Sequence, residues 1–192
     1  MSSDDFSLPN FGLCGYLRSG KSTVADYLQD HYGYTRLGFA VALKEEVARG
    51  VGCEPKLLDE EPLRSQIRPV LQVWGTDFRR GQDPEYWLKQ AEARIDAATG
   101  PIVFDDVRFL NEVEMLRAKG FLIIKIDMRL DDVLRYAGSS DNEISASLHH
   151  RSEREWQSAQ FDGVIPSRRG DVSGLLQAFD SFLLAHLGSG GR

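Results

Sequence analysis

The chain has few cysteines and no long hydrophobic run. Cys14 and Cys53 are its only cysteines, and they offer neither a disulfide framework nor the spacing of a metal site. No apolar stretch approaches the roughly 20 residues that a membrane-spanning helix needs. Basic residues are also in deficit, because 23 Lys and Arg stand against 29 Asp and Glu, for a net charge of −6. This balance argues against a nucleic acid partner, which requires clustered cations.

Composition otherwise indicates an ordinary globular protein. Of the 192 residues, 42% are hydrophobic and 27% are charged. Residues 1–5, MSSDD, are acidic where a signal peptide would be basic. We therefore expect a cytoplasmic protein that does not associate with membranes. The length predicts one domain over residues 1–187, and the Gly- and Ser-rich residues 188–192 are expected to form a flexible tail.

Apolar strands and amphipathic helices alternate along the chain. The expected strands span 11–14, 34–38, 101–104, 121–126 and 162–165. Helical spacing of apolar residues is found over 20–31, 40–49, 61–80, 84–98, 108–118 and 172–187. This alternation predicts an α/β fold with a parallel sheet, in which ligands bind beyond the carboxyl ends of the strands. The segment 136–147, rich in Gly, Ser, Asp and Asn, is expected to form a mobile loop.

A phosphate-binding loop is the strongest motif of the sequence. Residues 15–22, GYLRSGKS, fit the pattern G-x-x-x-x-G-K-[ST] between an apolar strand and an amphipathic helix. Backbone N–H groups and the helix N-terminus of such a loop hold phosphate oxygens. We expect Lys21 to reach the β- and γ-phosphates and the Ser22 hydroxyl to bind Mg²⁺. The remaining expected nucleotide contacts are Gly15, Arg18, Ser19, Gly20 and Thr23. The chain is thus predicted to bind a nucleoside triphosphate.

Two adjacent carboxylates, Asp105 and Asp106, follow the expected strand 101–104. Phosphate-loop enzymes hold Mg²⁺ or its water with an aspartate near the loop. The alternative is that both acids cap the helix that follows. Because neighbouring side chains of a strand point to opposite faces, only one of the two is expected to face the nucleotide.

The segment 63–87 gathers side chains that recognise anions and aromatic rings. It contains Arg64, Arg68, Gln72, Trp74, Arg79, Arg80, Tyr86 and Trp87. Arginine can hold a phosphate through two hydrogen bonds, and Trp or Tyr can stack on a base. The alternative is an exposed charged helix with Trp74 and Trp87 in the core. As a set, these residues favour a binding site for a second, anionic substrate.

Arg129 and Arg135 bracket a short segment after the expected strand 121–126. In phosphoryl-transfer enzymes, arginines of a closing loop neutralise charge on the transferred group and exclude water. A solvated helix end is the alternative.

Several of these motifs together resemble the phage-type deoxynucleoside monophosphate kinases and, more distantly, the animal phosphomevalonate kinases. The matching runs are residues 15–23, FA at 39–40 with LK at 43–44, LQVWGTDFRR at 71–80, DPEYW at 83–87, DVRFLNE at 106–112 and HRSE at 150–153. They cover roughly residues 10–185 in order. One difference is SRRG at 167–170, where the family often has Asn-x-Gly and where we expect the adenine to be contacted.

The resemblance implies a three-layer nucleoside monophosphate kinase-like fold with a five-stranded parallel sheet, an acceptor-binding region at about 39–90 and a lid at about 129–155. It implies transfer of the γ-phosphoryl group of ATP to a deoxynucleoside 5′-monophosphate with Mg²⁺. When the family's motif is aligned with DVRFLNE, its metal-binding aspartate corresponds to Asp106. The implied catalytic residues are Lys21, Asp106, Arg129 and Arg135. The implied acceptor-binding residues are Lys44, Arg68, Gln72, Trp74, Arg79, Asp83, Trp87 and Arg108.

Other assignments stay open at this point. The acceptor could be another small phosphorylated molecule, as in phosphomevalonate kinase or dephospho-coenzyme A kinase. A non-catalytic nucleotide switch would bind ATP without an acceptor. A polynucleotide kinase is disfavoured by the negative net charge. The resemblance also allows a homodimer and, for a phage-encoded enzyme, the cytoplasm of the infected host.

Overall fold

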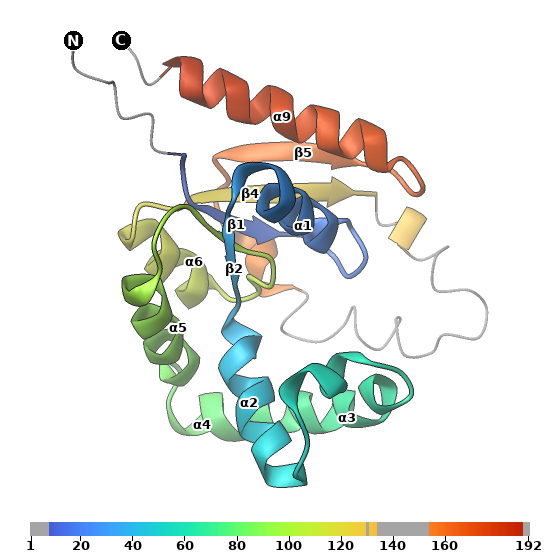
Figure 1. The fold of residues 1–192 in the computed structure, drawn as a ribbon, viewed down its shortest axis with the longest axis vertical. Helices are drawn as coiled ribbons and strands as arrows, with labels where there is room; N and C mark the ends of the chain where they lie inside the picture. Colours follow the sequence, from blue (N-terminus) through green and yellow to red (C-terminus); the bar gives the residue numbers. More distant parts are fainter. Residues whose placement is uncertain (1–7, 130, 134–153, 190–192) are drawn as a thin grey trace. The chain divides into compact units, whose positions relative to one another are not determined.

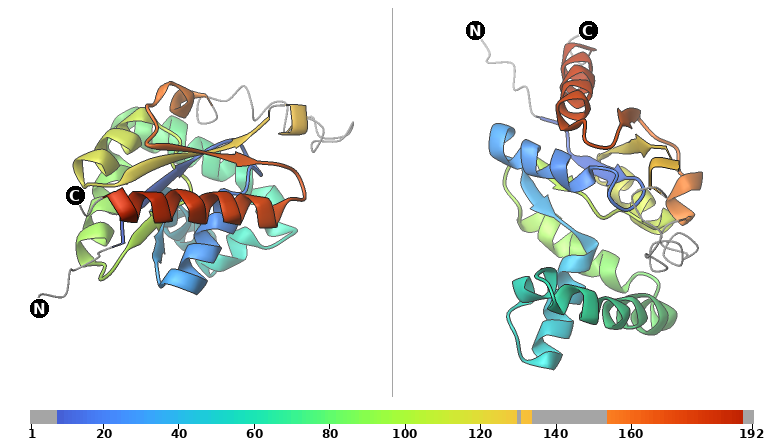
Figure 2. Two further views of the ribbon diagram at one scale, coloured as in Figure 1. Left: turned by 90° about the horizontal axis from the view of Figure 1, so that it is seen from above. Right: turned by 90° about the vertical axis from the view of Figure 1, so that its right-hand side faces the viewer.

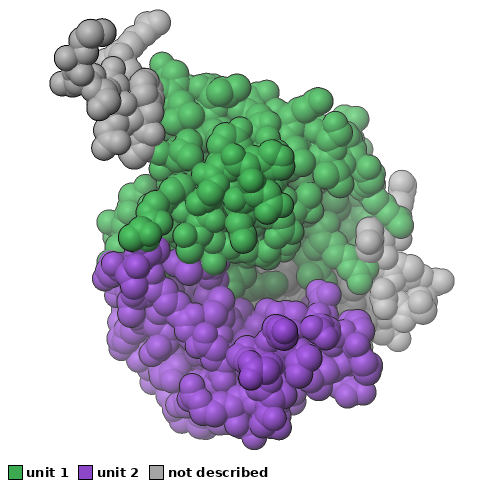
Figure 3. All heavy atoms as spheres, in the orientation of Figure 1, with its two compact units in different colours: residues 1–36, 99–192 green, residues 37–98 purple. Residues whose placement is uncertain are grey.

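The computed structural model describes residues 8–129, 131–133 and 154–189, and divides into two compact units. Unit 1 comprises residues 1–36 and 99–192, and unit 2 comprises residues 37–98. Figure 3 colours the two units separately. The segment expected to bind the acceptor, 39–90, lies within unit 2.

A five-stranded parallel sheet forms the centre of unit 1, with the strand order β2-β3-β1-β4-β5 (Figure 1). The strands are β1 (Phe11–Cys14), β2 (Thr35–Leu37), β3 (Ile102–Phe104), β4 (Leu122–Met128) and β5 (Gly163–Ser167). All four residues of β1 are buried, as its central position requires. Phe11 lies opposite Val103 on one side and Leu122 on the other. The sequence-based prediction of the five strands and the α/β class is confirmed, with strand ends that differ by at most two residues.

Helices cover both faces of this sheet. They are α1 (Lys21–Tyr32), α6 (Leu110–Ala118) and α9 (Val172–Ser189), with the short 3₁₀ helix η4 (Glu155–Ser158). Phe11 and Leu13 of β1 share a buried cluster with residues of α1 and α9, and Figure 2 shows these two helices on the same face. Gly12 faces the opposite side of the sheet, because a Cβ added to it would contact Leu116 of α6. The unit therefore has three layers.

Helix α9 ends later than the sequence indicated. It extends through Gly188 and Ser189, which we expected in the flexible tail. Its apolar residues, among them Leu175, Phe179 and Leu183, continue at helical spacing into the core, and this packing stabilises the helix. Among the described residues, no helix is both long and apolar enough to cross a bilayer.

Unit 2 consists of helices. They are α2 (Phe39–Val51), η1 (Pro55–Asp59), α3 (Leu63–Gln72), η2 (Val73–Arg79), α4 (Arg80–Gln82) and α5 (Tyr86–Ala97). One buried cluster in this unit contains Val47, Ala48, Leu58 and Ile67.

The expected continuous helix over 61–80 is interrupted by η2, a π-helical turn. Gly75 in this turn approaches α2 so closely that an added Cβ would lie 2.6 Å from a methyl carbon of Leu43. Single π-turns inside helices are frequent at functional sites. The turn brings Trp74, Phe78 and Arg79 into the cluster described below.

Candidate active site

The phosphate loop joins β1 to α1 in unit 1 and depends on glycine at both ends. Gly15 and Gly20 have φ angles of 148° and 103°, and Arg18 between them has a φ of 62°. A Cβ at Gly15 would lie 2.6 Å from the carbonyl oxygen of Ile126, which is backbone and cannot move aside cheaply. The loop conformation is therefore restricted to glycine at these two positions.

Lys21 folds back over the loop that precedes it. Its Nζ donates to the carbonyl oxygens of Gly15 at 2.8 Å and Tyr16 at 2.7 Å, and the residue is buried. A buried cation at the start of a helix, beside a glycine-rich turn, is what a phosphate-loop lysine supplies to the phosphates of a nucleotide. Contact of Lys21 with the phosphates of a nucleotide stays a prediction.

The loop is also tied to the last strand of the sheet. The Ser167 hydroxyl donates to the carbonyl oxygen of Ser19 at 2.7 Å. Tyr16 packs edge-on against Trp156, with 5.2 Å between ring centroids. The Ser19 hydroxyl is buried and has no hydrogen-bond partner among the residues that the structure describes. Ser167, which we expected near the adenine, thus has a structural contact to the phosphate loop.

A network of charges lies beside Ser22. The Ser22 hydroxyl donates to Asp105 Oδ2 at 2.7 Å. Arg36, the middle residue of β2, donates from Nε to Asp105 Oδ1 at 3.1 Å, and from Nη2 to Asp105 Oδ2. Its Nη1 donates to Asp26 on α1. Desolvation lowers the pKa of Arg36, but the hydrogen bond and the charge of Asp105 outweigh it and raise the pKa overall, so the guanidinium stays charged.

The carboxylate that contacts Ser22 belongs to Asp105, whereas the resemblance led us to expect Asp106. Both acids follow the last residue of β3, Phe104, so the alternation of the strand could not choose between them. Asp106 is partly buried and contributes negative charge at Arg36. A metal-binding role for Asp106 remains a prediction, and the contact with Ser22 favours Asp105.

Ser22 and Asp105 suit Mg²⁺ that arrives with a nucleotide. Mg²⁺ prefers oxygen ligands and usually combines one or two protein groups with phosphates and water. Here a hydroxyl and a carboxylate oxygen are within 2.7 Å of each other. Within the described part of the chain, no group of three or more His, Cys, Asp or Glu could hold a metal. The hydroxyl and the carboxylate fit a metal ion whose other ligands are phosphate oxygens and water.

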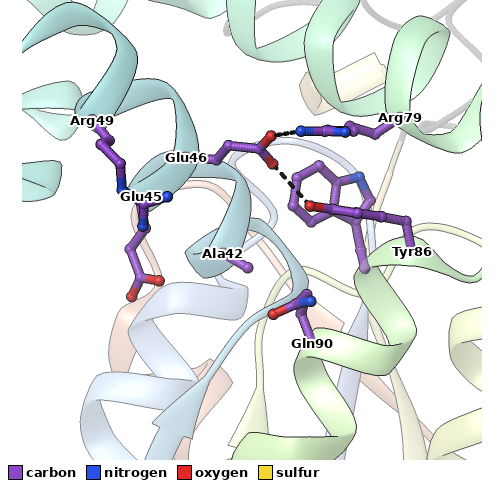
Figure 4. Close-up of a pocket in the computed structure, with 8 residues that line it drawn as sticks. Ala42, Glu45, Glu46, Arg49, Arg79, Tyr86 and Gln90 are labelled. Atoms are coloured by element: carbon purple, nitrogen blue, oxygen red, sulfur yellow. Dashed lines mark hydrogen bonds and ion pairs between the residues drawn. The ribbon is translucent and has the colours of Figure 1, made fainter.

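Arg79 of unit 2 is held in a cluster of aromatic rings. Its guanidinium carbon lies 5.3 Å from the ring centroid of Trp74, 5.6 Å from that of Phe78 and 4.8 Å from that of Tyr86. It also forms an ion pair with Glu46, which accepts a hydrogen bond from Tyr86, as Figure 4 shows. This arrangement fixes the orientation of Arg79 and neutralises part of its charge.

Arg79 lines a polar cavity of about 250 Å³ within unit 2 (Figure 4). The other lining residues are Ala42, Glu45, Glu46, Arg49, Tyr86, Trp87 and Gln90. Glu45 is paired with Arg94. The side chains of Arg49 and Gln90 carry no hydrogen bond or ion pair to another described residue. The cavity thus offers one cation and one amide for a ligand.

Trp87 belongs to the core of unit 2. It is 3% exposed, and its indole N–H donates to the carbonyl oxygen of Gly75 at 2.9 Å. A position in the core is the alternative to base stacking that the sequence analysis left open for Trp87. The burial of Trp87 leaves little ring surface on which a base could stack. Trp74 is half-buried and stacks on Phe78, with 4.8 Å between centroids.

The other expected acceptor residues differ in their surroundings. Lys44 is paired with Asp59, at 2.7 Å from Nζ to Oδ1. Asp83 accepts hydrogen bonds from Lys89 and from the backbone N–H of Glu85, and these lower the pKa of its carboxyl group. The remaining three are Arg68 and Gln72, both exposed on α3, and Arg108 in unit 1, which is partly buried.

The expected lid falls largely outside the described residues. Arg129 lies just after β4, and its side chain is 80% exposed. Its Nη2 is 3.6 Å from Oδ2 of Asp131. Arg135, the loop 136–147 and most of the segment 129–155 are outside the described ranges.

Arg36 and Arg49 are candidates that the sequence analysis did not identify. Arg36 could have been found by the rule that ligands bind beyond the carboxyl ends of parallel strands, because it stands in the expected strand 34–38. No local signal distinguishes Arg49 from other exposed helical arginines.

Comparisons with known proteins agree with the fold. No family model matches the chain. A protein of Acanthamoeba polyphaga mimivirus with the provisional name deoxynucleotide monophosphate kinase is 28% identical over 139 residues, which cover 60% of this chain and 72% of that protein. Shikimate kinase from Aquifex aeolicus matches with a TM-score of 0.54 and 13% identity, over 95% of this chain and 99% of that chain. A gluconokinase from Sinorhizobium meliloti matches with a TM-score of 0.56 and 14% identity, over 95% and 96% of the two chains.

The fold and the phosphate loop together define a P-loop protein with the fold of small-molecule kinases. Within that class, the chain is like the nucleoside monophosphate kinases, in line with its similarity to the mimivirus protein and with the sequence motifs.

Proposed function

We propose that this protein transfers the γ-phosphoryl group of ATP to a deoxynucleoside 5′-monophosphate, and so forms ADP and a deoxynucleoside diphosphate. The observation that carries the proposal is the arrangement of Lys21, Ser22 and Asp105 at the end of the phosphate loop. The choice of acceptor is supported by the name of the mimivirus relative and by the motifs at 71–80 and 106–112.

In unit 1, the loop would hold the phosphates of ATP through its backbone N–H groups. Lys21 would release the carbonyl oxygens of Gly15 and Tyr16 and turn its ammonium group to the β- and γ-phosphates. Ser22, with Asp105 or Asp106, would hold Mg²⁺, which when bound offsets the charge that builds up on the phosphates. Arg129 and Arg135 are proposed to neutralise the transferred group.

The transfer step needs no general base. An oxygen of the acceptor phosphate, already ionised at pH 7, forms a bond to the γ-phosphorus. The bond between that phosphorus and the β–γ bridging oxygen breaks, and its electron pair stays on ADP. Catalysis then consists of alignment and charge stabilisation by fixed groups of the protein.

We assign recognition of the acceptor to side chains of unit 2. Arg49 and Gln90 line the cavity and have no competing partner among the described residues, so they are suited to a phosphate oxygen and to a polar edge of the ligand. Arg79 is paired with Glu46 and is better suited to shaping the cavity. Arg68, Gln72 and Trp74 remain proposed contacts, as does Arg108 of unit 1.

A second candidate function is a kinase for another small acceptor. Shikimate kinase and gluconokinase share the fold, so the fold alone does not select a nucleotide. Phosphomevalonate and dephospho-coenzyme A are the acceptors that the sequence motifs leave open. A nucleotide switch without an acceptor would hydrolyse ATP slowly, and no added acceptor would stimulate it.

The test is a coupled assay of ADP formation with a panel of acceptors. The panel contains dAMP, dCMP, dGMP, dTMP, the ribonucleotides, phosphomevalonate and dephospho-coenzyme A, and Lys21→Ala serves as the inactive control. We expect at least one deoxynucleoside monophosphate to stimulate ADP release well above the rate without acceptor. Stimulation only by phosphomevalonate or dephospho-coenzyme A would replace the proposed acceptor, and no stimulation by any acceptor would contradict the proposal.

A further inference from the structure

Arg36 has no part in the steps described above, yet it contacts the same carboxylate as Ser22. Its Nε and Nη2 donate to the two oxygens of Asp105, in the two-point contact that suits a guanidinium and a carboxylate. One of these oxygens, Oδ2, is also the acceptor for the Ser22 hydroxyl. Both oxygens of Asp105 therefore accept hydrogen bonds from the Arg36 guanidinium.

We propose that Arg36 takes the place of Mg²⁺ on Asp105 while no nucleotide is bound, and that it sets the Mg²⁺ concentration at which the site accepts a metal-bound nucleotide. This inference rests on the proposed function, because it requires Mg²⁺ to bind with the nucleotide at Ser22. A divalent cation that reaches Ser22 and Asp105, directly or through its water, meets the positive charge of Arg36 on the same carboxylate. The side chain of Asp105 is only 11% exposed, so solvent screens this repulsion weakly.

Asp26 gives Arg36 a second carboxylate. It lies on α1 and accepts from Nη1, the nitrogen of Arg36 that does not contact Asp105. The side chain of Asp26 is mostly exposed, so it can follow a displaced guanidinium. Arg36 can thus leave Asp105 and still keep an ion pair. Asp26 is expected to ease the uptake of Mg²⁺, and Arg36 to oppose it.

Removal of the charge of Arg36 and removal of the charge of Asp26 are therefore expected to shift the Mg²⁺ midpoint of nucleotide binding in opposite directions. The experiment measures binding of methylanthraniloyl-ADP by fluorescence, from metal-free buffer with EDTA to saturating Mg²⁺. Arg36→Gln is expected to lower the Mg²⁺ midpoint about tenfold, because a unit charge near a divalent cation contributes on that order even after screening. Asp26→Asn is expected to raise it several-fold.

Two further variants complete the test. Arg117→Gln removes the same charge elsewhere in unit 1, where Arg117 contacts Asp162 and the carbonyl of Gln160, and is expected to leave the midpoint unchanged. Arg36→Lys keeps the charge but cannot bond both oxygens of Asp105, so its midpoint is expected between those of the wild type and Arg36→Gln. If Arg36→Gln does not fold, the shift of the Mg²⁺ midpoint in Arg36→Lys alone tests the inference.

A readout without nucleotide checks the pairing itself. In EDTA, Arg36→Gln is expected to have a lower Tm than the wild type, because Asp105 loses its counter-ion, and saturating Mg²⁺ with ADP is expected to restore most of the difference. A midpoint that is unchanged or higher in both Arg36 variants would overturn the inference and make Arg36 a residue that only orients Asp105. A wild-type protein that binds ADP at no Mg²⁺ concentration would instead refute the proposed function, and this inference with it.

Discussion

Replacement of Asp105 by asparagine is expected to reduce activity far more than the same replacement of Asp106. An asparagine side chain would keep the shape of the aspartate but lose the negative charge that holds the Ser22 hydroxyl and the two nitrogens of Arg36. A carboxylate at this position is also the expected partner of Mg²⁺ or its water. Loss of one such preorganised charge typically lowers kcat by about 10²-fold or more.

The same substitution has a second, smaller effect on stability. A hydrogen bond to a charged group contributes about 1.5–3 kcal/mol where it is shielded from water. The Arg36 side chain is about one-third exposed, so the contribution has to be discounted for solvent screening. We expect Asp105→Asn to lower the free energy of unfolding by about 1 kcal/mol. This loss is too small to unfold a typical domain, so the loss of activity can be measured on folded protein.

The assay compares kcat of Asp105→Asn, Asp106→Asn and the wild type across a Mg²⁺ titration, with thermal unfolding followed by circular dichroism. Asp106→Asn is the matched control, since it removes the same charge one residue away. A larger loss of activity in Asp106→Asn would refute the argument from the Ser22 contact and support the assignment that the sequence motif suggested. Equal losses would show that both carboxylates act on the metal.

Four further predictions follow from particular contacts. Lys21→Ala is expected to lower kcat by about 10²-fold or more, because it removes the cation at the phosphates, and to leave the circular dichroism spectrum unchanged. A variant with wild-type turnover would exclude a working phosphate loop. Trp87→Phe is expected to lower the free energy of unfolding by about 1 kcal/mol, because it removes the hydrogen bond to Gly75, and to leave the KM for the acceptor unchanged. A rise in that KM alone would show that Trp87 contributes to acceptor binding. Arg49→Ala is expected to raise the acceptor KM and lower kcat at a constant KM for ATP, and a change confined to ATP would contradict its assignment to the acceptor. Burial, reinforced by Glu112, raises the pKa of the Cys14 thiol from 9.0 to about 12. The folded protein therefore holds this proton more tightly than the unfolded chain, so the wild type should lose stability as the pH rises above 9, by up to about 1.4 kcal/mol per pH unit relative to Cys14→Ala, and parallel pH profiles of the two would disprove it.

Local patterns of the sequence determined most of the secondary structure and the donor side of the site. The five strands are short apolar runs next to turn residues, so their positions follow from composition alone. The phosphate loop is equally local, because its glycines, Lys21 and Ser22 lie within eight consecutive residues and their roles depend on the backbone of one turn. The acceptor-binding and lid residues remain predictions.

The tertiary structure decided what depends on contacts between distant segments. Asp105 and Asp106 are neighbours of the same chemistry, and contacts from Ser22, 83 residues away in sequence, and from Arg36 distinguish Asp105. Arg79 resembles any exposed helical arginine until the π-turn and α2 place it against Trp74 and Glu46. Trp87 was equally compatible with stacking on a base and with the core, and the packing of α5 against Gly75 decided for the core. Sequence periodicity describes which face of an element is apolar, whereas the partner of a charged or aromatic side chain depends on which elements the fold brings together.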